Sequence, residues 1–236
     1  MKIFRDAKKF QAWCRGLSRN GRRIALVPTM GYLHEGHLSL IAAARRRGAD
    51  EIVVSIFVNP VQFGPNEDYE KYPRDEQADL AKCCAAGATA VFLPAPSAMY
   101  AGDHSTYIDE LQLSRGLCGA RRPGHFRGVC TVVAKLFNLT HPDFAVFGRK
   151  DYQQAQVIKR MVRDLDFDLK IVVAPIVREK SGLAKSSRNV YLSDEERQRA
   201  LAISRTLRSL KPLSRIGTVK SELEKAGLKN ISKLRK

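Results

Sequence analysis

The chain has 236 residues, of which 44% are hydrophobic and 28% charged, and its formal net charge is +17. This length suits one large domain, or one domain with a smaller one attached, and the composition is that of a globular protein. No apolar run approaches the roughly 20 residues that cross a bilayer, and residues 1–6 lack the apolar core of a signal peptide. Five irregularly spaced cysteines favour reduced thiols. We therefore expect a cytoplasmic protein without membrane segments.

The positive charge makes nucleic acid one candidate partner. The basic residues are dispersed, however, with a triplet at residues 45–47, a pair at 121–122, and ten basic against two acidic residues from 205 onwards. No basic face interleaved with aromatic residues, of the kind that stacks bases, is visible. Attraction of anionic small molecules is therefore the favoured interpretation, and nucleic-acid binding the less favoured one.

Hydrophobic patterning predicts strands alternating with helices along most of the chain. Apolar spacing predicts helices over residues 8–17, 38–48, 75–86, 129–139 and 152–165. Apolar and β-branched runs predict strands over residues 24–27, 51–58, 90–93, 105–108, 144–147 and 169–174. Because such alternation produces a parallel sheet with right-handed crossovers, we predict a Rossmann-like, doubly wound α/β fold.

The character of the chain changes near residue 176. Residues 177–189 read as a long polar loop with small hydroxyl and basic side chains. Ser193 and Glu196 then form a capping box for a helix to about residue 210, and a second short helix is predicted over residues 219–226. We therefore predict a nucleotide-binding domain over residues 1–176 and a small C-terminal domain over residues 177–236.

The segment PTMGYLHEGH, residues 28–37, is the centre of the predicted site. It lies between a predicted strand and a predicted helix, and the N-terminus of such a helix suits phosphate. His34 and His37 would share one face of the helix, where imidazolium groups could stabilise charge during phosphoryl or nucleotidyl transfer. They could equally be surface residues or half of a metal site. The metal interpretation is the weakest, because no CxxC and no second HxxH supplies further ligands.

Other polar clusters also follow predicted strands directly. Gln62 comes after the strand at 51–58, and Lys150, Asp151 and Gln154 come after the strand at 144–147. In parallel sheets, ligands bind outside the carboxyl ends of the strands. We therefore expect these side chains and the two histidines to meet at one sheet edge.

Five motifs in this order, PTMGYLHEGH, SIFVNPVQFG, RPGHFRGV, FGRKDYQQ and GLAKSSRN, resemble the pantothenate synthetase (pantoate–β-alanine ligase) family of the nucleotidylyltransferase superfamily. The resemblance implies ATP-dependent condensation of pantoate with β-alanine through a pantoyl adenylate, with release of pyrophosphate and AMP. It implies Mg²⁺-ATP as substrate, no tightly bound cofactor, and a homodimer.

The resemblance also assigns residues. Contacts to ATP are expected from the first motif, from the segment around Lys150, from the main chain at Val177 and from a mobile KSSR loop. Within the Lys150 segment, Gly148 and Asp151 would contact the ribose. The expected ATP-binding residues are Met30, Gly31, Tyr32, Leu33, His34, Glu35, Gly36, His37, Gly148, Arg149, Lys150, Asp151, Val177, Lys185, Ser186, Ser187 and Arg188. The catalytic groups among these would be His37, His34, Lys150, Ser186, Ser187 and Arg188. Pantoate and β-alanine would meet Gln62, Gln154, Arg122 and His125, and Asp79 would be a magnesium ligand.

The chain departs from the family pattern in four places. Arg149 stands where glutamate is usual, Lys185 where an apolar residue is usual, and Cys118 where an acidic residue is common. The family's C-terminal domain usually continues for several dozen residues, whereas this sequence stops at residue 236. A reduced lid, a truncated lid and a lid completed by another chain are the alternatives, and each bears on closure over the adenylate. A nucleotidylyltransferase or acid-activating ligase with another substrate is the enzyme alternative, because it would share the HEGH and KSSR segments without requiring Gln62 and Gln154.

Overall fold

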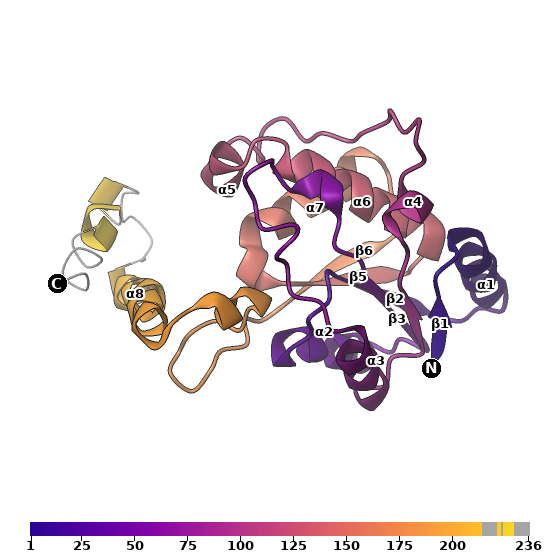
Figure 1. Ribbon diagram of the computed structural model, residues 1–236, viewed down its shortest axis with the longest axis horizontal. Coiled ribbons are helices and arrows are strands. Elements are labelled where there is room, and N and C mark those ends of the chain that lie inside the picture. Colours follow the sequence, from indigo (N-terminus) through magenta and orange to yellow (C-terminus); the bar gives the residue numbers. More distant parts are fainter. Residues whose placement is uncertain (214–220, 223, 229–236) are drawn as a thin grey trace. The chain divides into compact units, whose positions relative to one another are not determined.

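The computed structural model describes residues 1–213, 221–222 and 224–228, and it divides the chain into two compact units, Met1–Pro175 and Ile176–Lys236. The first unit contains a six-stranded sheet whose strands are all parallel (Figure 1). The spatial order is β1-β4-β3-β2-β5-β6, with β1 at Lys2–Phe4, β2 at Ile24–Thr29, β3 at Glu51–Ile56, β4 at Ala90–Phe92, β5 at Phe144–Gly148 and β6 at Lys170–Ala174. This topology confirms the predicted doubly wound α/β fold.

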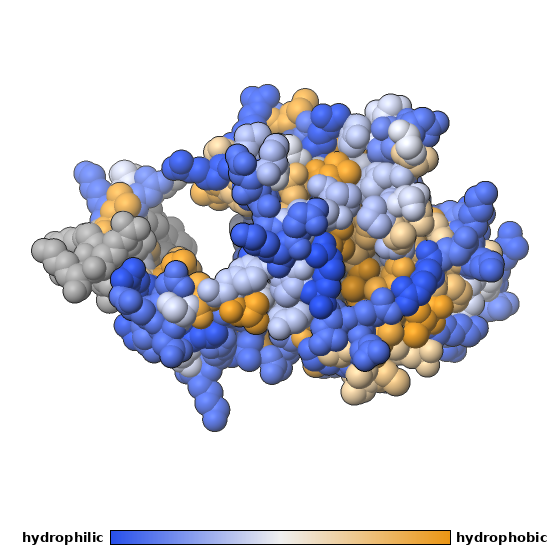
Figure 2. Space-filling view, viewed as in Figure 1, coloured by the Kyte–Doolittle hydropathy of each residue, from blue (hydrophilic) through white to orange (hydrophobic). Residues whose placement is uncertain are grey.

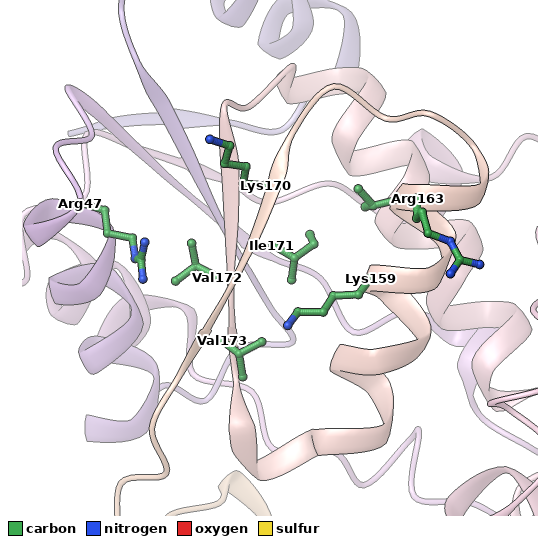
Figure 3. A pocket seen from close by; sticks show the side chains of 8 residues that line it. Arg47, Lys159, Arg163, Lys170, Ile171, Val172 and Val173 are labelled. Atoms are coloured by element: carbon green, nitrogen blue, oxygen red, sulfur yellow. The ribbon is translucent and has the colours of Figure 1, made fainter.

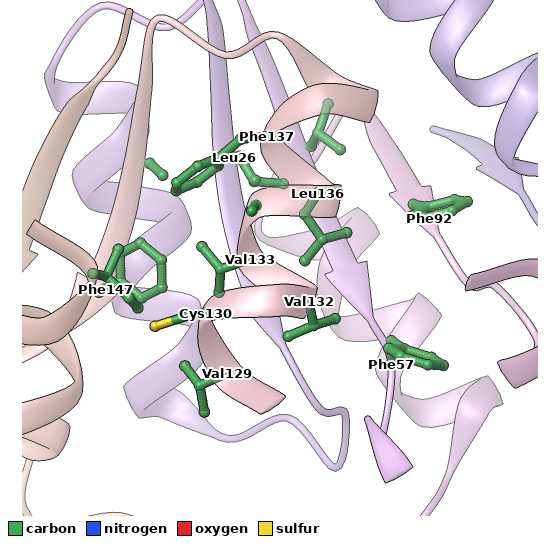
Figure 4. Packing of buried hydrophobic residues seen from close by; sticks show 14 of the residues in the cluster. Leu26, Phe57, Phe92, Val129, Cys130, Val132, Val133, Leu136, Phe137 and Phe147 are labelled. Atoms are coloured by element: carbon green, nitrogen blue, oxygen red, sulfur yellow. The ribbon is translucent and has the colours of Figure 1, made fainter. Parts of the chain in front are cut away.

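Helices cover both faces of this sheet (Figure 1). One face carries α1, α6 and α7, which span Ala7–Arg19, His125–Thr140 and Tyr152–Asp164; the other carries α2 and α3, which span Glu35–Arg46 and Glu76–Ala85. Alternation along the strands divides the core accordingly, since Leu26 packs on the α6 side and Val27 on the α2 side. Figure 4 shows the α6 side, where Val133 and Phe137 lie close to Leu26.

Two features of the first unit differ from the prediction. The three-residue strand β1 was not predicted; it pairs with β4 at the sheet edge, and it is too short to show a period. Residues 105–108 form no strand and cross α6 instead. There the Ile108 N–H donates to Thr131 Oγ1 at 3.0 Å, and the Arg127 guanidinium lies 4.2 Å from the Tyr107 ring. Side-chain contacts to a helix therefore replace the expected ladder.

The connections carry several short helical turns. They are α4 at Pro96–Met99, α5 at Leu117–Arg121, η1 at Pro60–Gln62 and η2 at Arg149–Asp151. Helix α6 begins at His125 rather than at 129, because Gly124 at its N-terminus adopts φ 79° and lets the chain turn directly into the helix. This places the RPGHFRGV motif across the start of α6.

The second unit, described by itself, begins with a tight reversal in which Arg178 bridges Ala184. The turn η3 follows at Ser187–Tyr191, then α8 at Asp194–Leu210 and η4 at Lys211–Leu213. The predicted capping box is present: Ser193 Oγ accepts from the Glu196 N–H, and the Glu196 carboxylate accepts from the Ser193 N–H. Residues 221–222 and 224–228 are helical, and the rest of the helix predicted over 219–226 lies outside the described residues.

On the face of residues 1–175 that Figure 2 presents, hydrophilic surface surrounds a central region of apolar surface. Within the described residues no helix has both the length and the apolar character needed to cross a bilayer.

Candidate functional site

The predicted site residues of the first unit gather at the carboxyl edge of the sheet. β2, β3 and β5 end at Thr29, Ile56 and Gly148, and because the strands are parallel these ends share one edge. The strand order also reverses between β2 and β5, which is where doubly wound sheets open a crevice for ligands. The segments that follow these three strands carry the histidines, Gln62 and Lys150.

The loop between β2 and α2 is held in a strained shape by α3. Gly31 and Tyr32 have φ values of 86° and 50°, in the left-handed region that is costly for a tyrosine. Asp79, only 1% exposed, accepts from the Tyr32 N–H through Oδ2 at 2.7 Å and from the Leu33 N–H through Oδ1 at 2.6 Å. Lys82, one turn further along α3, donates to the Leu33 carbonyl at 2.8 Å. The loop shape therefore depends on a helix more than forty positions away.

The two histidines cap α2 and contact each other. His34 Nδ1 accepts from the Gly36 N–H at 3.0 Å, and His37 Nδ1 accepts from the His34 N–H at 3.3 Å. The ring centroids lie 4.1 Å apart. Because each Nδ1 is an acceptor, a neutral ring carries its proton on Nε2, which is then a hydrogen-bond donor.

The surroundings of His37 favour the neutral ring over the expected imidazolium. Its pKa is lowered to about 3, chiefly by burial and also by the nearby charges of His34, Lys150 and Lys82. The charges of both lysines act on His37, although Lys150 comes from η2 and Lys82 from α3. At neutral pH the site therefore offers an imidazole N–H together with lysine ammonium groups, an arrangement suited to the charge of a polyphosphate.

Gln62 belongs to a buried hydrogen-bond network. Its Oε1 accepts from Asn59 Nδ2 at 3.1 Å, and its Nε2 lies 3.1 Å from Met30 Sδ, a weak acceptor. Asn59 is 1% exposed, donates also to the Gly128 carbonyl at 3.1 Å, and accepts from the Tyr100 hydroxyl at 2.8 Å. The network fixes the orientation of the Gln62 amide.

Arg122 and His125 approach the same glutamine from the start of α6. His125 Nδ1 donates to the Gln62 carbonyl at 2.9 Å, so its Nε2 can accept from Arg122, 3.2 Å away. Arg122 also pairs with Glu67, whose pKa is held below its ordinary value chiefly by that hydrogen bond. Gly128 lets α6 pack closely against the main chain of Val61 and Gln62, since a Cβ at this position would lie 2.5 Å from the Val61 carbonyl oxygen. The structure thus brings Gln62, Arg122 and His125 together.

The segment after β5 supplies the second predicted nucleotide contact. Gly148, Arg149, Lys150 and Asp151 lie at the end of β5 and in η2, and Arg149 is exposed, so the departure from the family pattern at this position faces solvent. Lys150 Nζ lies 3.4 Å from Asp151 Oδ1, and both side chains are partly exposed. Gln154, on the first turn of α7, is partly buried.

The predicted KSSR loop lies in the second unit. Within that unit the Lys185 N–H donates to the Val177 carbonyl at 3.0 Å. Ser186 Oγ accepts from the Arg188 N–H at 3.3 Å, and Ser187 is buried at 6% exposure. Hydrogen bonds within the loop therefore hold its backbone. Its two basic side chains are at positions 185 and 188.

Asp79 has a role that the sequence did not reveal. Both of its oxygens accept main-chain N–H groups, and desolvation raises its pKa above the ordinary value despite these bonds. In the described part of the chain, no three His, Cys, Asp or Glu residues cluster as metal ligands. Its contacts are those of a residue that holds the histidine loop, and the assignment of Asp79 to magnesium stays a prediction.

A family model described as pantoate–beta-alanine ligase matches residues 2–235. The chain belongs to the pantoate–β-alanine ligase family. A pantothenate synthetase of Myxococcus xanthus is 59% identical over 96% of this chain and 81% of its own length. One of Pelotomaculum thermopropionicum is 50% identical over 100% of this chain and 79% of its own length.

Solved structures of pantoate–β-alanine ligases have the same fold. The pantothenate synthetase of Thermus thermophilus is 45% identical and superposes with a TM-score of 0.91 over 99% of this chain and 83% of that one. A pantoate–β-alanine ligase of Francisella tularensis, solved with a β,γ-ATP compound and β-alanine, is 36% identical and has a TM-score of 0.80 over 96% of this chain and 86% of that one.

Sequence reasoning missed several residues that shape this ligase site, among them Asn59, Glu67, Lys82 and Tyr100. Asn59 had a visible signal, because it precedes Gln62 within the same motif. Lys82 lies three positions after Asp79 and hence on the same face of α3. Glu67 and Tyr100 act only through tertiary contacts, so no local pattern marks them.

A separate groove follows the outer edge of β6. It has a volume of about 470 Å³, and four basic side chains, Arg47, Lys159, Arg163 and Lys170, surround a floor formed largely by β6 (Figure 3). None of the predicted site residues lines it. The groove contributes to the positive surface without belonging to the ligase site.

Proposed function

We propose that this chain condenses pantoate with β-alanine at the expense of ATP, with release of AMP and pyrophosphate. The observation that carries this proposal is the placement of two chemically different clusters at one sheet edge. One cluster, His37 with Lys150 and Lys82, offers hydrogen-bond donors and positive charge to a phosphate. The other cluster is the amide network of Gln62 and Asn59. The first cluster suits a nucleoside triphosphate, and the second suits a small hydroxy acid.

In the first half-reaction the pantoate carboxylate attacks the α-phosphorus of ATP. A bond forms between the carboxylate oxygen and phosphorus, and the bond from phosphorus to the bridging oxygen breaks, so pyrophosphate leaves with that electron pair. Negative charge accumulates on the phosphoryl oxygens. In this proposal the neutral His37 N–H and the Lys150 ammonium stabilise that charge as hydrogen-bond donors, without having to move a proton.

In the second half-reaction the amine of β-alanine attacks the acyl carbon of the adenylate. The new C–N bond replaces the C–O bond, AMP leaves as the anion, and the nitrogen gives up a proton. Adenylation is required because a free carboxylate is a poor electrophile. Holding both substrates in place supplies much of the rate enhancement.

The remaining site residues have binding roles in this proposal. Gln62 and Gln154 bind the hydroxyl and carboxylate groups of pantoate, and Arg122 and His125 line the side where pantoate and β-alanine enter. Gly148 and Asp151 bind the ribose, the main chain near Val177 meets adenine, and Ser186, Ser187 and Arg188 contact the triphosphate.

Magnesium would enter as the ATP complex. Mg²⁺ usually keeps several waters and binds through phosphates and one or two carboxylates, so a site without a protein cage suits it. Asp79 fits less well as a direct ligand, because both oxygens already accept main-chain N–H groups. We also propose that the protein is cytoplasmic and forms a homodimer. Sedimentation of the purified protein would test the oligomeric state.

The test is pantoate-dependent pyrophosphate release from Mg²⁺-ATP, measured with and without β-alanine. We expect a limited amount of pyrophosphate without β-alanine, and turnover to AMP and pantothenate when it is added. Release stimulated by other acids but not by pantoate would favour an acid-activating ligase of different specificity. Absence of release from protein that binds ATP would refute the proposal. Steeply salt-dependent RNA binding would instead support the nucleic-acid alternative.

A further inference from the structure

One side chain outside the assigned site, Gln153, uses every polar atom it has on a single turn of backbone. Its Oε1 accepts from the Cys118 N–H at 3.0 Å. Its Nε2 donates to the Leu113 carbonyl at 2.8 Å and to the Gly116 carbonyl at 2.7 Å. Gln153 lies on the first turn of α7, about forty residues away in sequence and next to Gln154. Three hydrogen bonds therefore tie residues 113–118 to the helix that follows the nucleotide segment.

The tied turn contains a strained residue. Leu117 has φ 50°, which costs a non-glycine residue roughly 1–2 kcal/mol. Its side chain is 81% exposed, so packing does not compensate. The two groups that flank it, the Gly116 carbonyl and the Cys118 N–H, are both bound by Gln153. A strained backbone conformation persists only where surrounding contacts hold it in place, and here the hydrogen bonds of Gln153 hold it.

The turn leads directly to Arg122. Helix α5 begins at Leu117, and the Arg122 N–H donates to the Cys118 carbonyl at 3.0 Å, at the far end of this five-residue helix. Arg122 in turn contacts the Gln62 carbonyl at 3.4 Å and pairs with Glu67. A continuous path of hydrogen bonds thus runs from Gln153 through Cys118 and Arg122 to Gln62.

We propose that Gln153 is a positioning residue for the acid-binding side of the site. It holds the strained turn at Leu117, and through α5 it sets where Arg122 meets Gln62. This inference rests on the proposed function, because it assigns Arg122 and Gln62 to pantoate and β-alanine. It predicts that loss of Gln153 weakens use of the acid substrates while nucleotide binding is retained.

The test compares Gln153→Ala and Gln153→Met with wild type. Methionine keeps the length and packing of the side chain but removes all three hydrogen bonds. We expect the KM for pantoate to rise about tenfold or more in both variants, with the KM for ATP changed less than about twofold. Gln156→Ala on the same helix is the matched control, and we expect it to resemble wild type.

Hydrogen exchange of residues 113–121 gives a second readout that does not require activity. Faster exchange at the Cys118 amide in both variants, with unchanged exchange in the strands, is expected because its acceptor is gone. Protection and KM values equal to those of wild type in Gln153→Met would overturn the inference, as would a rise in both KM values together. If wild type lacks pantoate-dependent activity, the proposed function fails, and exchange alone decides whether Gln153 holds the turn.

Discussion

Replacing Asp79 with asparagine separates its two possible roles, as an anchor for the histidine loop and as a ligand for magnesium. Asparagine has the same size but only one acceptor oxygen, so its amide nitrogen would face either the Tyr32 or the Leu33 N–H. One main-chain donor is left buried without a partner, and the other hydrogen bond loses its ionic character. The strain at Tyr32, with φ 50°, is then held less firmly.

The expected loss of stability follows from these contacts. A hydrogen bond to a charged group contributes about 1.5–3 kcal/mol, and an unsatisfied buried donor costs about 1–3 kcal/mol. Since one acceptor remains, we expect Asp79→Asn to lower the free energy of unfolding by about 3 kcal/mol. For a chain of this size that corresponds to a fall in Tm of roughly 6–12 °C. Asp75→Asn is the matched control: Asp75 caps the same helix, and asparagine caps as well as aspartate does.

Thermal unfolding and a magnesium titration of the ligase rate together decide the question. An anchor predicts a lower Tm and a reduced rate at every magnesium concentration, with an unchanged concentration at half-maximal rate. A stable Asp79→Asn protein that merely needs more magnesium would refute the anchoring argument and support the metal role.

Three further predictions concern charge and packing. Nuclear magnetic resonance should find His37 protonating near pH 3 in the free protein, and pyrophosphate should move this pKa upward because an anion favours the imidazolium. Because the folded pKa lies below the ordinary value of 6.5, His37 contributes stability that is lost as pH falls between these values; acid unfolding less steep in His37→Gln would confirm it. Gly128→Ala places a Cβ 2.6 Å from the Gln62 main chain, so chemical denaturation should show a loss of about 1–3 kcal/mol together with weaker pantoate use. Gly16→Ala, with nothing within 4 Å of the added Cβ, should leave stability equal or higher.

The fold could be predicted because its signals are local and repeated. Each buried strand of the parallel sheet is an apolar run, and the topology alone then assembles the segments after β2, β3 and β5 at one edge. The prediction failed where the signal was short or misleading. β1 has only three residues. Residues 105–108 have the composition of a strand, but they contact α6 and form no strand.

The protonation state of His37 could not be predicted from its motif. A helix N-terminus after a strand was visible in the sequence, but the burial of the ring and the approach of Lys82 from α3 were not. Both effects favour the neutral ring, and both depend on elements distant in sequence. Sequence reasoning therefore could not give the lowered pKa of His37, and the catalytic role of this residue stays a prediction.

Asp79 and Gln153 use their polar atoms in the same way, to hold main-chain groups of a distant segment. Asp79 gives both oxygens, and Gln153 gives its oxygen and its amide nitrogen, to main-chain groups. Each of them holds a left-handed non-glycine residue, Tyr32 or Leu117, beside a predicted binding segment. A sequence motif identifies binding groups because the residue types themselves indicate the chemistry. Residues such as Asp79 and Gln153, which hold the backbone of a distant segment, can be recognised only from the structure.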